Sequence, residues 1–212
     1  ESVIFKGDDN SYYEKFADGD IIDISQYLPY DIPESWTWTR LSSLCVKEVK
    51  RGKAPKYVEQ SGTLVFAQKC NLKKGGIDYN LARFLNEDIL SKYDNTEFIH
   101  KGDIVINSTG TGTLGRVGYI DSEAYFPIVP DSHITTIRIS KCLDNYYVYI
   151  FLKSMQPLLE KSGEGSTNQK ELKPIKIQDI LIPVPPVKEQ NYICKQVINS
   201  NKLLESIEAR LN

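Results

Sequence analysis

The sequence is poor in the residues that build metal centres and disulfide frameworks. Its two histidines, His100 and His133, lie far apart, and none of its four cysteines forms a Cys-x-x-C pair. Structural zinc sites draw their ligands from closely spaced pairs of these residues, so we expect no metal site. Scattered cysteines are typical of reduced thiols in a cytoplasmic protein. The four are Cys45, Cys70, Cys142 and Cys194.

Long apolar runs are also missing. No stretch approaches the roughly 18 residues that a membrane-spanning helix needs, and Glu1 is not followed by the charged and then apolar segments of a signal peptide. We therefore expect a cytoplasmic protein with no membrane partner. The formal net charge of −2 excludes a uniformly basic surface. Nucleic-acid binding would then require the basic residues to gather on one face.

No set of side chains suits catalysis. Ser132 and His133 are adjacent, so in a strand they would point to opposite faces and could not act as nucleophile and base. The sequence lacks an Asn-Pro-Pro-Phe methyltransferase motif and a carboxylate–lysine nuclease cluster. We therefore expect a chain with no catalytic residues.

The chain of 212 residues divides into three parts by its pattern. Residues 1–30 are turn-rich and acidic, which indicates an irregular, extended arm. Residues 31–187 alternate short apolar runs with glycine-containing loops and predict the main domain. Residues 188–212 predict one helix, which stops without a capping glycine and so suggests a truncated element. Trp36 and Trp38 alternate near the domain's start, so one should face the core and the other a rim.

Within the domain, short apolar runs predict buried strands near residues 64–67, 104–106, 117–120, 133–139 and 176–182. Apolar residues at helical spacing predict a short helix over 81–90 and a longer one over 146–161. Asp144 or Asn145 can cap the longer helix. Pro157 lies inside it and should kink or restart it. The run from Arg40 to Val49 fits either a strand or a short helix.

The domain and the last helix meet at a proline-rich elbow, which reads IQDILIPVPPVKEQ over residues 177–190. Pro183, Pro185 and Pro186 should end the strand before them, because proline has no N–H donor. Glu189 and Gln190 follow, where the first turn of a helix favours acidic and polar residues. We therefore expect a stiff joint that holds the helix at a fixed angle.

The last helix carries an apolar seam with heptad spacing. A lone helix with such a seam is marginal and needs a partner helix, for which this chain has no second candidate. The alternative is that the helix folds back onto its own domain. The seam, interrupted at Ser200, is Ile193, Val197, Leu204, Ile207 and Leu211.

Residues 110–115 have the spacing Gly-x-Gly-x-x-Gly. A dinucleotide site would need a helix to open at the third glycine, whereas the following segment, Arg116 to Ile120, has the composition of a strand. The alternatives are a glycine-rich hairpin and a loop whose small residues allow a ligand close to the backbone.

Three loops combine cations with short polar side chains suited to phosphates and base edges. Solvated or structural roles are the alternative for each loop. The basic loop contributes Lys69, Asn71, Lys73 and Lys74. The Gly/Thr loop and its flanks contribute Asn107, Ser108, Thr109, Thr111, Thr113 and Arg116. The third loop contributes Thr167, Asn168, Gln169 and Lys170.

The run IKIQDILIPVPPVKEQNYI closely resembles the end of a target-recognition domain in the specificity subunits of type I restriction–modification enzymes. IPESWTWTRL resembles the entry to such a domain, and ESVIFKGDDNSYYEK resembles the linker before it. The loop from Gly165 to Gln169 also resembles a Gly-Ser-Thr-x-Gln segment of the family. The resemblance thus covers nearly the whole chain.

The resemblance implies an α+β fold: a mixed, strongly twisted β-sheet target-recognition domain with flanking short helices, then a long helix for coiled-coil pairing. It also implies that the chain reads one half of a bipartite double-stranded DNA target. A second recognition domain, in a longer chain or a dimer, would read the other half. The methyltransferase subunits, and through them the restriction subunit, would be partners. The assembled complex would be a site-specific deoxyribonuclease and DNA adenine methyltransferase.

S-adenosylmethionine, ATP and Mg²⁺ would belong to those partner subunits, and this chain would hold no cofactor. Two other functions remain open from the residues alone. One is a nucleotide-binding enzyme that uses residues 110–115, and the other is a helix-mediated protein-interaction module without DNA binding.

Overall fold

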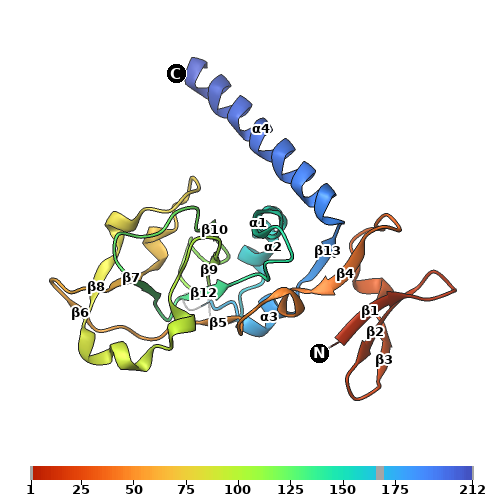
Figure 1. The fold of residues 1–212 in the computed structure, drawn as a ribbon, viewed down its shortest axis with the longest axis horizontal. Coiled ribbons are helices and arrows are strands. Elements are labelled where there is room, and N and C mark those ends of the chain that lie inside the picture. Colours follow the sequence, from red (N-terminus) through yellow and green to blue (C-terminus); the bar gives the residue numbers. More distant parts are fainter. Residues whose placement is uncertain (1, 166–169, 212) are drawn as a thin grey trace.

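The computed structural model describes residues 2–165 and 170–211, which form three parts in chain order (Figure 1). A small β-meander comes first and lies beside the central α+β domain. The domain holds two four-stranded sheets, and the long helix α4 projects from it. The predicted α+β class, with short helices and a long C-terminal helix, is confirmed. Its strands form several small sheets rather than one.

The N-terminal segment is a three-stranded antiparallel sheet, so the prediction of an irregular arm is wrong. Turns at Asn10 (φ 67°) and Gly19 (φ 100°) allow the chain to reverse twice. Ile4 and Ile24 pack with Trp38 of β4 (Thr37–Arg40), which docks the meander on the domain. The turn residues had obscured the short strands between them. These strands are β1 (Ser2–Lys6), β2 (Tyr12–Phe16) and β3 (Ile21–Asp23).

A buried ion pair also holds the meander. The Glu14 carboxylate, 1% exposed, accepts hydrogen bonds from Nη2 and Nε of Arg40 at 2.6 and 3.1 Å. Those hydrogen bonds, with one from Ser2, hold the pKa of Glu14 below its usual range despite burial.

We expect acid to loosen the meander first. Because the folded pKa of Glu14 is lowered, its contribution to stability is present above the unfolded pKa and is lost as pH falls through the folded value. Fluorescence of the buried Trp38 should therefore change below about pH 4. Glu14→Gln should remove this acid step, while Glu34→Gln, at an exposed carboxylate, should keep it. An unaltered acid transition in Glu14→Gln would contradict the assignment.

The central domain has two four-stranded sheets and a two-stranded one. The first has the order β10-β9-β12-β5 and the second β11-β7-β8-β6. Only the pair of β7 and β11 is parallel among the described strands, so the second sheet is mixed. The two-stranded sheet pairs β4 with β13. The strands are β5 (Lys50–Arg51), β6 (Tyr57–Val58), β7 (Leu64–Phe66), β8 (Arg83–Leu85), β9 (Ile104–Asn107), β10 (Val117–Tyr119), β11 (Ile128–Pro130), β12 (Ile134–Ile137) and β13 (Leu181–Val184).

Strand β9 is buried on both faces and joins two cores. Ile104 and Ile106 pack in the cluster that includes α1 (Asn145–Ser154), whereas Val105 packs in the cluster with Phe66 of β7. Side chains alternate between the faces of a strand, so one continuous apolar run supplies both cores. The predicted strands at 64–67, 104–106, 117–120 and 133–139 are confirmed, with small shifts of their ends.

The predicted helix over 146–161 is two helices, α1 and α2 (Gln156–Lys161). They meet at Met155, because Pro157 in the first turn of α2 cannot donate to the preceding turn. Asp144 caps α1, as expected, by accepting from the N–H of Tyr146 at 2.8 Å. The remaining α-helices are the short α3 (Pro174–Gln178) and the long α4 (Val187–Leu211).

Three local predictions are wrong. Residues 81–90 are strand β8 between two 3₁₀ turns, because β8 pairs with β7 and Asn86 starts a new turn. The segment around Lys176 is α3, which Pro174 begins. Pro183 was expected to end its strand, but β13 continues through it. Pro183 pairs with Trp38 in a two-stranded sheet, where its missing N–H interrupts no hydrogen bonds between interior strands.

The remaining elements are short 3₁₀ helices between the strands. The run from Arg40 to Val49, left open between strand and helix, begins with the last residue of β4 and continues as one of them. They are η1 (Ser25–Tyr27), η2 (Leu41–Leu44), η3 (Gln68–Cys70), η4 (Tyr79–Leu81), η5 (Glu87–Lys92) and η6 (Asn95–Glu97).

Candidate nucleic-acid interface

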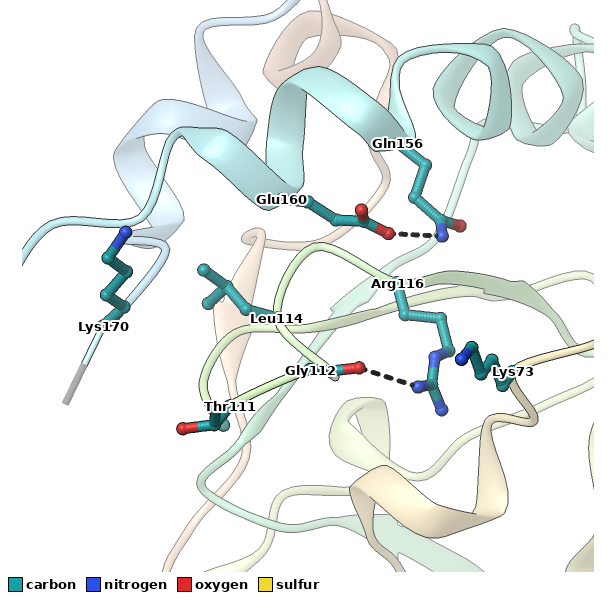
Figure 2. Close-up of a pocket in the computed structure, with 9 residues that line it drawn as sticks. Lys73, Thr111, Gly112, Leu114, Arg116, Gln156, Glu160 and Lys170 are labelled. Atoms are coloured by element: carbon teal, nitrogen blue, oxygen red, sulfur yellow. Dashed lines mark hydrogen bonds between the residues drawn. The ribbon is translucent and has the colours of Figure 1, made fainter. Parts of the chain in front are cut away.

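Two of the predicted loops and the last predicted residue of the third, Lys170, meet at one cleft of about 460 Å³ (Figure 2). The basic loop contributes Lys73, the Gly/Thr loop contributes Thr111 and Arg116, and Lys170 comes from the segment before α3. Sequence separation between these residues is large, so their convergence is a property of the fold. Three cations around one open cleft suit an anionic ligand.

The Gly/Thr loop is a series of turns that ends where β10 begins at Val117. No helix opens at Gly115, so the geometry of a dinucleotide site is absent from this loop. Gly110, Gly112 and Gly115 have φ of 95°, 76° and 77°, where side chains are disfavoured. A Cβ on Gly115 would lie 2.5 Å from the backbone nitrogen of Glu160. The close approach that this glycine allows is therefore to α2 of the same chain.

Arg116 fastens two loops together. Its Nη1 donates to the carbonyl of Asn71 at 2.7 Å and its Nη2 to the carbonyl of Gly112 at 3.1 Å. The side chain is half-buried and also lines the cleft. Since a guanidinium has five N–H donors, Arg116 can hold the loops and still offer donors to a ligand.

Three predicted contact residues are buried instead. Asn71, Asn107 and Ser108 are at most 1% exposed. Asn71 Nδ2 donates to Asn107 Oδ1 at 3.1 Å, and the Ser108 hydroxyl pairs with that of Thr135 at 2.6 Å. We correct their predicted role, because buried polar groups bonded to one another support the loops and do not face a ligand.

The threonines of the loop divide in the same way. Thr109 is half-buried and its hydroxyl pairs with His133 Nδ1 at 2.7 Å. Thr113 Oγ1 donates to the carbonyl of Thr109 at 3.1 Å, which closes the turn. Thr111 is exposed at the cleft. Among the loop's three threonines, it is therefore the one best placed for a ligand.

The basic loop sends adjacent lysines to different places. Lys73 lines the cleft with Arg116, whereas Lys74 lines a groove beside α4, together with Glu205 of that helix. Lys69 is exposed and lines neither hollow. The single basic surface expected from the sequence is thus divided. Predicted residues Thr167, Asn168 and Gln169 lie outside the described residues, and only Lys170 of that loop can be placed.

The sequence did not point to two residues of the cleft, Gln156 and Glu160 of α2. Gln156 Nε2 donates to Glu160 Oε1 at 2.8 Å, and Gln156 Oε1 accepts from Lys153 Nζ at 2.7 Å. Their four-residue spacing on one helix was the only available signal. Glu160 thus adds a carboxylate to the cations of the cleft. This carboxylate can accept a hydrogen bond from an amino group of a ligand.

Helix α4 divides the predicted seam between two environments. Ile193 packs against the core cluster of α1, and Val197 lines the groove between the two helices. Further out, Leu204, Ile207 and Leu211 are 58%, 44% and 81% exposed. The first turns of α4 therefore pack onto their own domain, whereas the apolar side chains further out remain exposed to solvent.

No helix in the described part of the chain is long and apolar enough to cross a membrane. Within residues 2–165 and 170–211, no group of three or more His, Cys, Asp or Glu residues is placed to hold a metal ion.

Comparisons with known proteins agree on one family. A family model described as the type I restriction modification DNA specificity domain matches residues 33–212. The chain is 27% identical over 194 residues to the type I restriction enzyme EcoBI specificity subunit of Escherichia coli, a match that covers 85% of this chain and 38% of the relative. It is 23% identical over 188 residues to the MjaVIII specificity subunit of Methanocaldococcus jannaschii, covering 85% and 39%.

Two solved structures show the same fold. The HsdS subunit from Thermoanaerobacter tengcongensis matches with a TM-score of 0.64 and 18% identity, over 86% of this chain and 41% of that one. A chain from a study of complex assembly in the type I R-M system matches with a TM-score of 0.67 and 17% identity, over 86% and 42%. This chain thus spans about two-fifths of the length of these relatives.

Proposed function

The chain belongs to the family of type I restriction modification DNA specificity domains, and from this membership we propose that it reads one half of a bipartite DNA target. The observation that carries the proposal is the convergence of Lys73, Arg116 and Lys170 on one cleft. Cations on a single face can bind DNA although the net charge is −2.

In this proposal some residues of the cleft contact phosphates and others contact base edges. Lys73 and Lys170 hold phosphates and fix the register, which carries no sequence information by itself. Arg116, Thr111 and Glu160 lie between them and are suited to base edges: a guanidinium for guanine and a carboxylate for the amino group of cytosine. Lys69 extends the phosphate contacts along the basic loop. Asn71, Asn107, Ser108, Thr109 and Thr113 keep these groups in place.

The outer half of α4 is the proposed partner surface. Its exposed Leu204, Ile207 and Leu211 need a second helix, which a second recognition domain would supply. Methyltransferase subunits, and through them a restriction subunit, would assemble around that pair. We keep the division into a linker (1–30), a recognition domain (31–187) and a spacer helix (188–212).

The chemistry would then belong to the assembled complex, a DNA adenine methyltransferase and site-specific deoxyribonuclease, and this chain would contribute no catalytic residue. S-adenosylmethionine, ATP and Mg²⁺ would bind the partner subunits, and the complex would work in the cytoplasm. The sequence lacks the motifs of a methyltransferase and of a nuclease that such chemistry would need.

Two neighbouring lysines test the cleft. Lys73→Ala should weaken DNA binding to a similar degree on all sequences and lower the salt slope by about one, because one phosphate contact is lost. Lys74→Ala removes the same charge from the next residue, which faces the groove beside α4, and should leave the salt slope nearly unchanged. Binding to duplex DNA over a range of salt concentrations measures both.

Methylation by the complex reconstituted with methyltransferase subunits gives a second readout. Lys73→Ala and Arg116→Ala should each reduce site-dependent methylation. Full retention of methylation by both variants would reject the cleft as the DNA-binding site.

A further inference from the structure

His133 is exposed and stands beside the Gly/Thr loop, outside the set of residues that line the cleft. Three hydrogen bonds fix its position. The backbone N–H of His133 donates to the buried carboxylate of Asp131 at 2.8 Å. The backbone carbonyl of His133 accepts from the N–H of Ser108 at 2.8 Å. Its ring Nδ1 lies 2.7 Å from the Thr109 hydroxyl. Backbone and ring are therefore both held by the base of the loop.

The hydrogen bonds of Thr109 favour a proton on Nε2 of His133 over one on Nδ1. The amide of Gln68 contacts the Thr109 carbonyl, and since a carbonyl only accepts, the Gln68 atom that faces it is the NH2 group. The same NH2 lies 3.2 Å from the Thr109 hydroxyl oxygen and donates to it. The hydroxyl hydrogen is then free to donate to His133 Nδ1. A neutral imidazole that accepts at Nδ1 carries its hydrogen on Nε2.

We propose that His133 is a specificity-determining residue, which presents a fixed Nε2–H donor to an acceptor on a base edge in the major groove. This proposal rests on the proposed DNA-recognition function. Guanine offers two acceptors there, N7 and O6, whereas the cytosine edge offers an amino donor. A single donor held at one place therefore favours guanine over cytosine at one position of the target.

The relay from Gln68 through Thr109 to His133 links this donor to the loops that form the cleft. Gln68 directly precedes Lys69 of the basic loop, and Thr109 directly precedes Gly110 in the Gly/Thr loop. In its neutral form the imidazole supplies a directed N–H donor without adding charge. Its loss should therefore alter sequence preference and leave the salt dependence of binding unchanged, unlike the loss of a phosphate-binding lysine.

The tautomer can be measured without DNA. The chain has two histidines, so ¹⁵N NMR of the imidazoles at mildly alkaline pH gives two sets of signals, and His100→Ala assigns them. The expected result is the Nε2–H form for His133. Thr109→Val removes the hydroxyl donor and should give a mixture of the two tautomers. A dominant Nδ1–H form in the unmodified protein would overturn the proposal.

Base preference is measured by methylation of a library of randomised targets by the reconstituted complex. His133→Ala should reduce discrimination against cytosine at one position by about tenfold, and Thr109→Val should reduce it less. His100→Ala, which changes an exposed histidine away from this loop, should have no effect. A uniform loss over all targets would indicate a phosphate contact and overturn the base-reading role.

Two further outcomes separate this proposal from the function on which it rests. If Lys73→Ala weakens binding while His133→Ala alters no base preference, His133 has no reading role and the DNA-recognition function stands. If neither Lys73→Ala nor His133→Ala has any effect, the proposed function fails together with this one.

Discussion

Gly115→Ala should lower the free energy of unfolding by about 2–5 kcal/mol. An alanine at φ 77° costs about 1–2 kcal/mol, and its Cβ would stand 2.5 Å from the backbone nitrogen of Glu160. Backbone cannot yield as a flexible side chain can, so overpacking adds about 1–3 kcal/mol. Urea unfolding of the variant measures the sum.

Gly112→Ala is the matched control, since this glycine lies in the same loop. Its φ is 76°, but an added Cβ would meet nothing within 4 Å. It should therefore lose about 1–2 kcal/mol from the backbone conformation alone. Equal losses in the two variants would show that α2 moves away freely, and would remove the close approach as the reason for a glycine at 115.

The same substitution bears on the cleft. Gly115 lies between Leu114 and Arg116, which both line it, and α2 supplies Glu160 to the other side. A loop pushed away from α2 would separate Arg116 from Glu160. Gly115→Ala should therefore reduce DNA binding beyond what its stability loss explains, measured at a temperature where the variant is fully folded.

The strands of the central domain could be predicted because their local and long-range preferences agree. Runs such as Ile104 to Ile106 are β-branched and end up buried on both faces, so propensity and packing favour the same structure. The break in the helix near Pro157 could also be predicted, since proline acts through its own covalent geometry. Such features need no knowledge of distant residues.

The wrong predictions fall where distant partners decide. Phe84 and Leu85 have apolar spacing that fits a helix, yet β7 offers Phe84 an unpaired edge and Leu85 fills a core. In the meander, turn residues dominate the composition. Its strands are stabilised by Trp38, far along the chain, which no local pattern reveals.

For the site, the sequence identified the right loops but not the direction of each side chain. Asn71 and Lys73 are two residues apart, and one is buried beneath the loop while the other lines the cleft. That choice follows from Asn107, a partner at the end of strand β9. Glu160 was missed for the same reason, because its helix reaches the cleft through packing against Gly115 and a hydrogen bond from Val117 to Gln156.

Gln190→Met should destabilise the joint between the domain and α4, with a loss of about 2–6 kcal/mol. Gln190 is 1% exposed, where the sequence suggested only a polar residue suited to a first turn. Its Oε1 accepts from the N–H of Asp144 at 2.9 Å, and its Nε2 donates to the carbonyl of Pro185 at 2.8 Å. Methionine has a similar shape but leaves both backbone groups unpaired, at about 1–3 kcal/mol each.

The two hydrogen bonds of Gln190 also affect how α4 is oriented relative to the domain. Asp144 caps α1 and Pro185 belongs to the elbow, so Gln190 ties the start of α4 to both. A second contact, from Trp36 Nε1 to Glu189 at 2.7 Å, is exposed and contributes less. Without Gln190 the prolines still limit the backbone, and Ile193 and Cys194 still pack against the core cluster of α1. These apolar contacts have no fixed direction, so the loss of both hydrogen bonds should let α4 rotate more freely against α1.

Spin labels on the exposed Cys142 and on Asn199→Cys would measure that freedom. Gln190→Met should broaden the distribution of distances between the labels. Gln196→Ala, at an exposed glutamine of the same helix, should change neither the width nor the stability. A narrow distribution in Gln190→Met would show that the prolines alone set the angle. A broad one would mean that half-site spacing, in the proposed function, depends on a single buried amide.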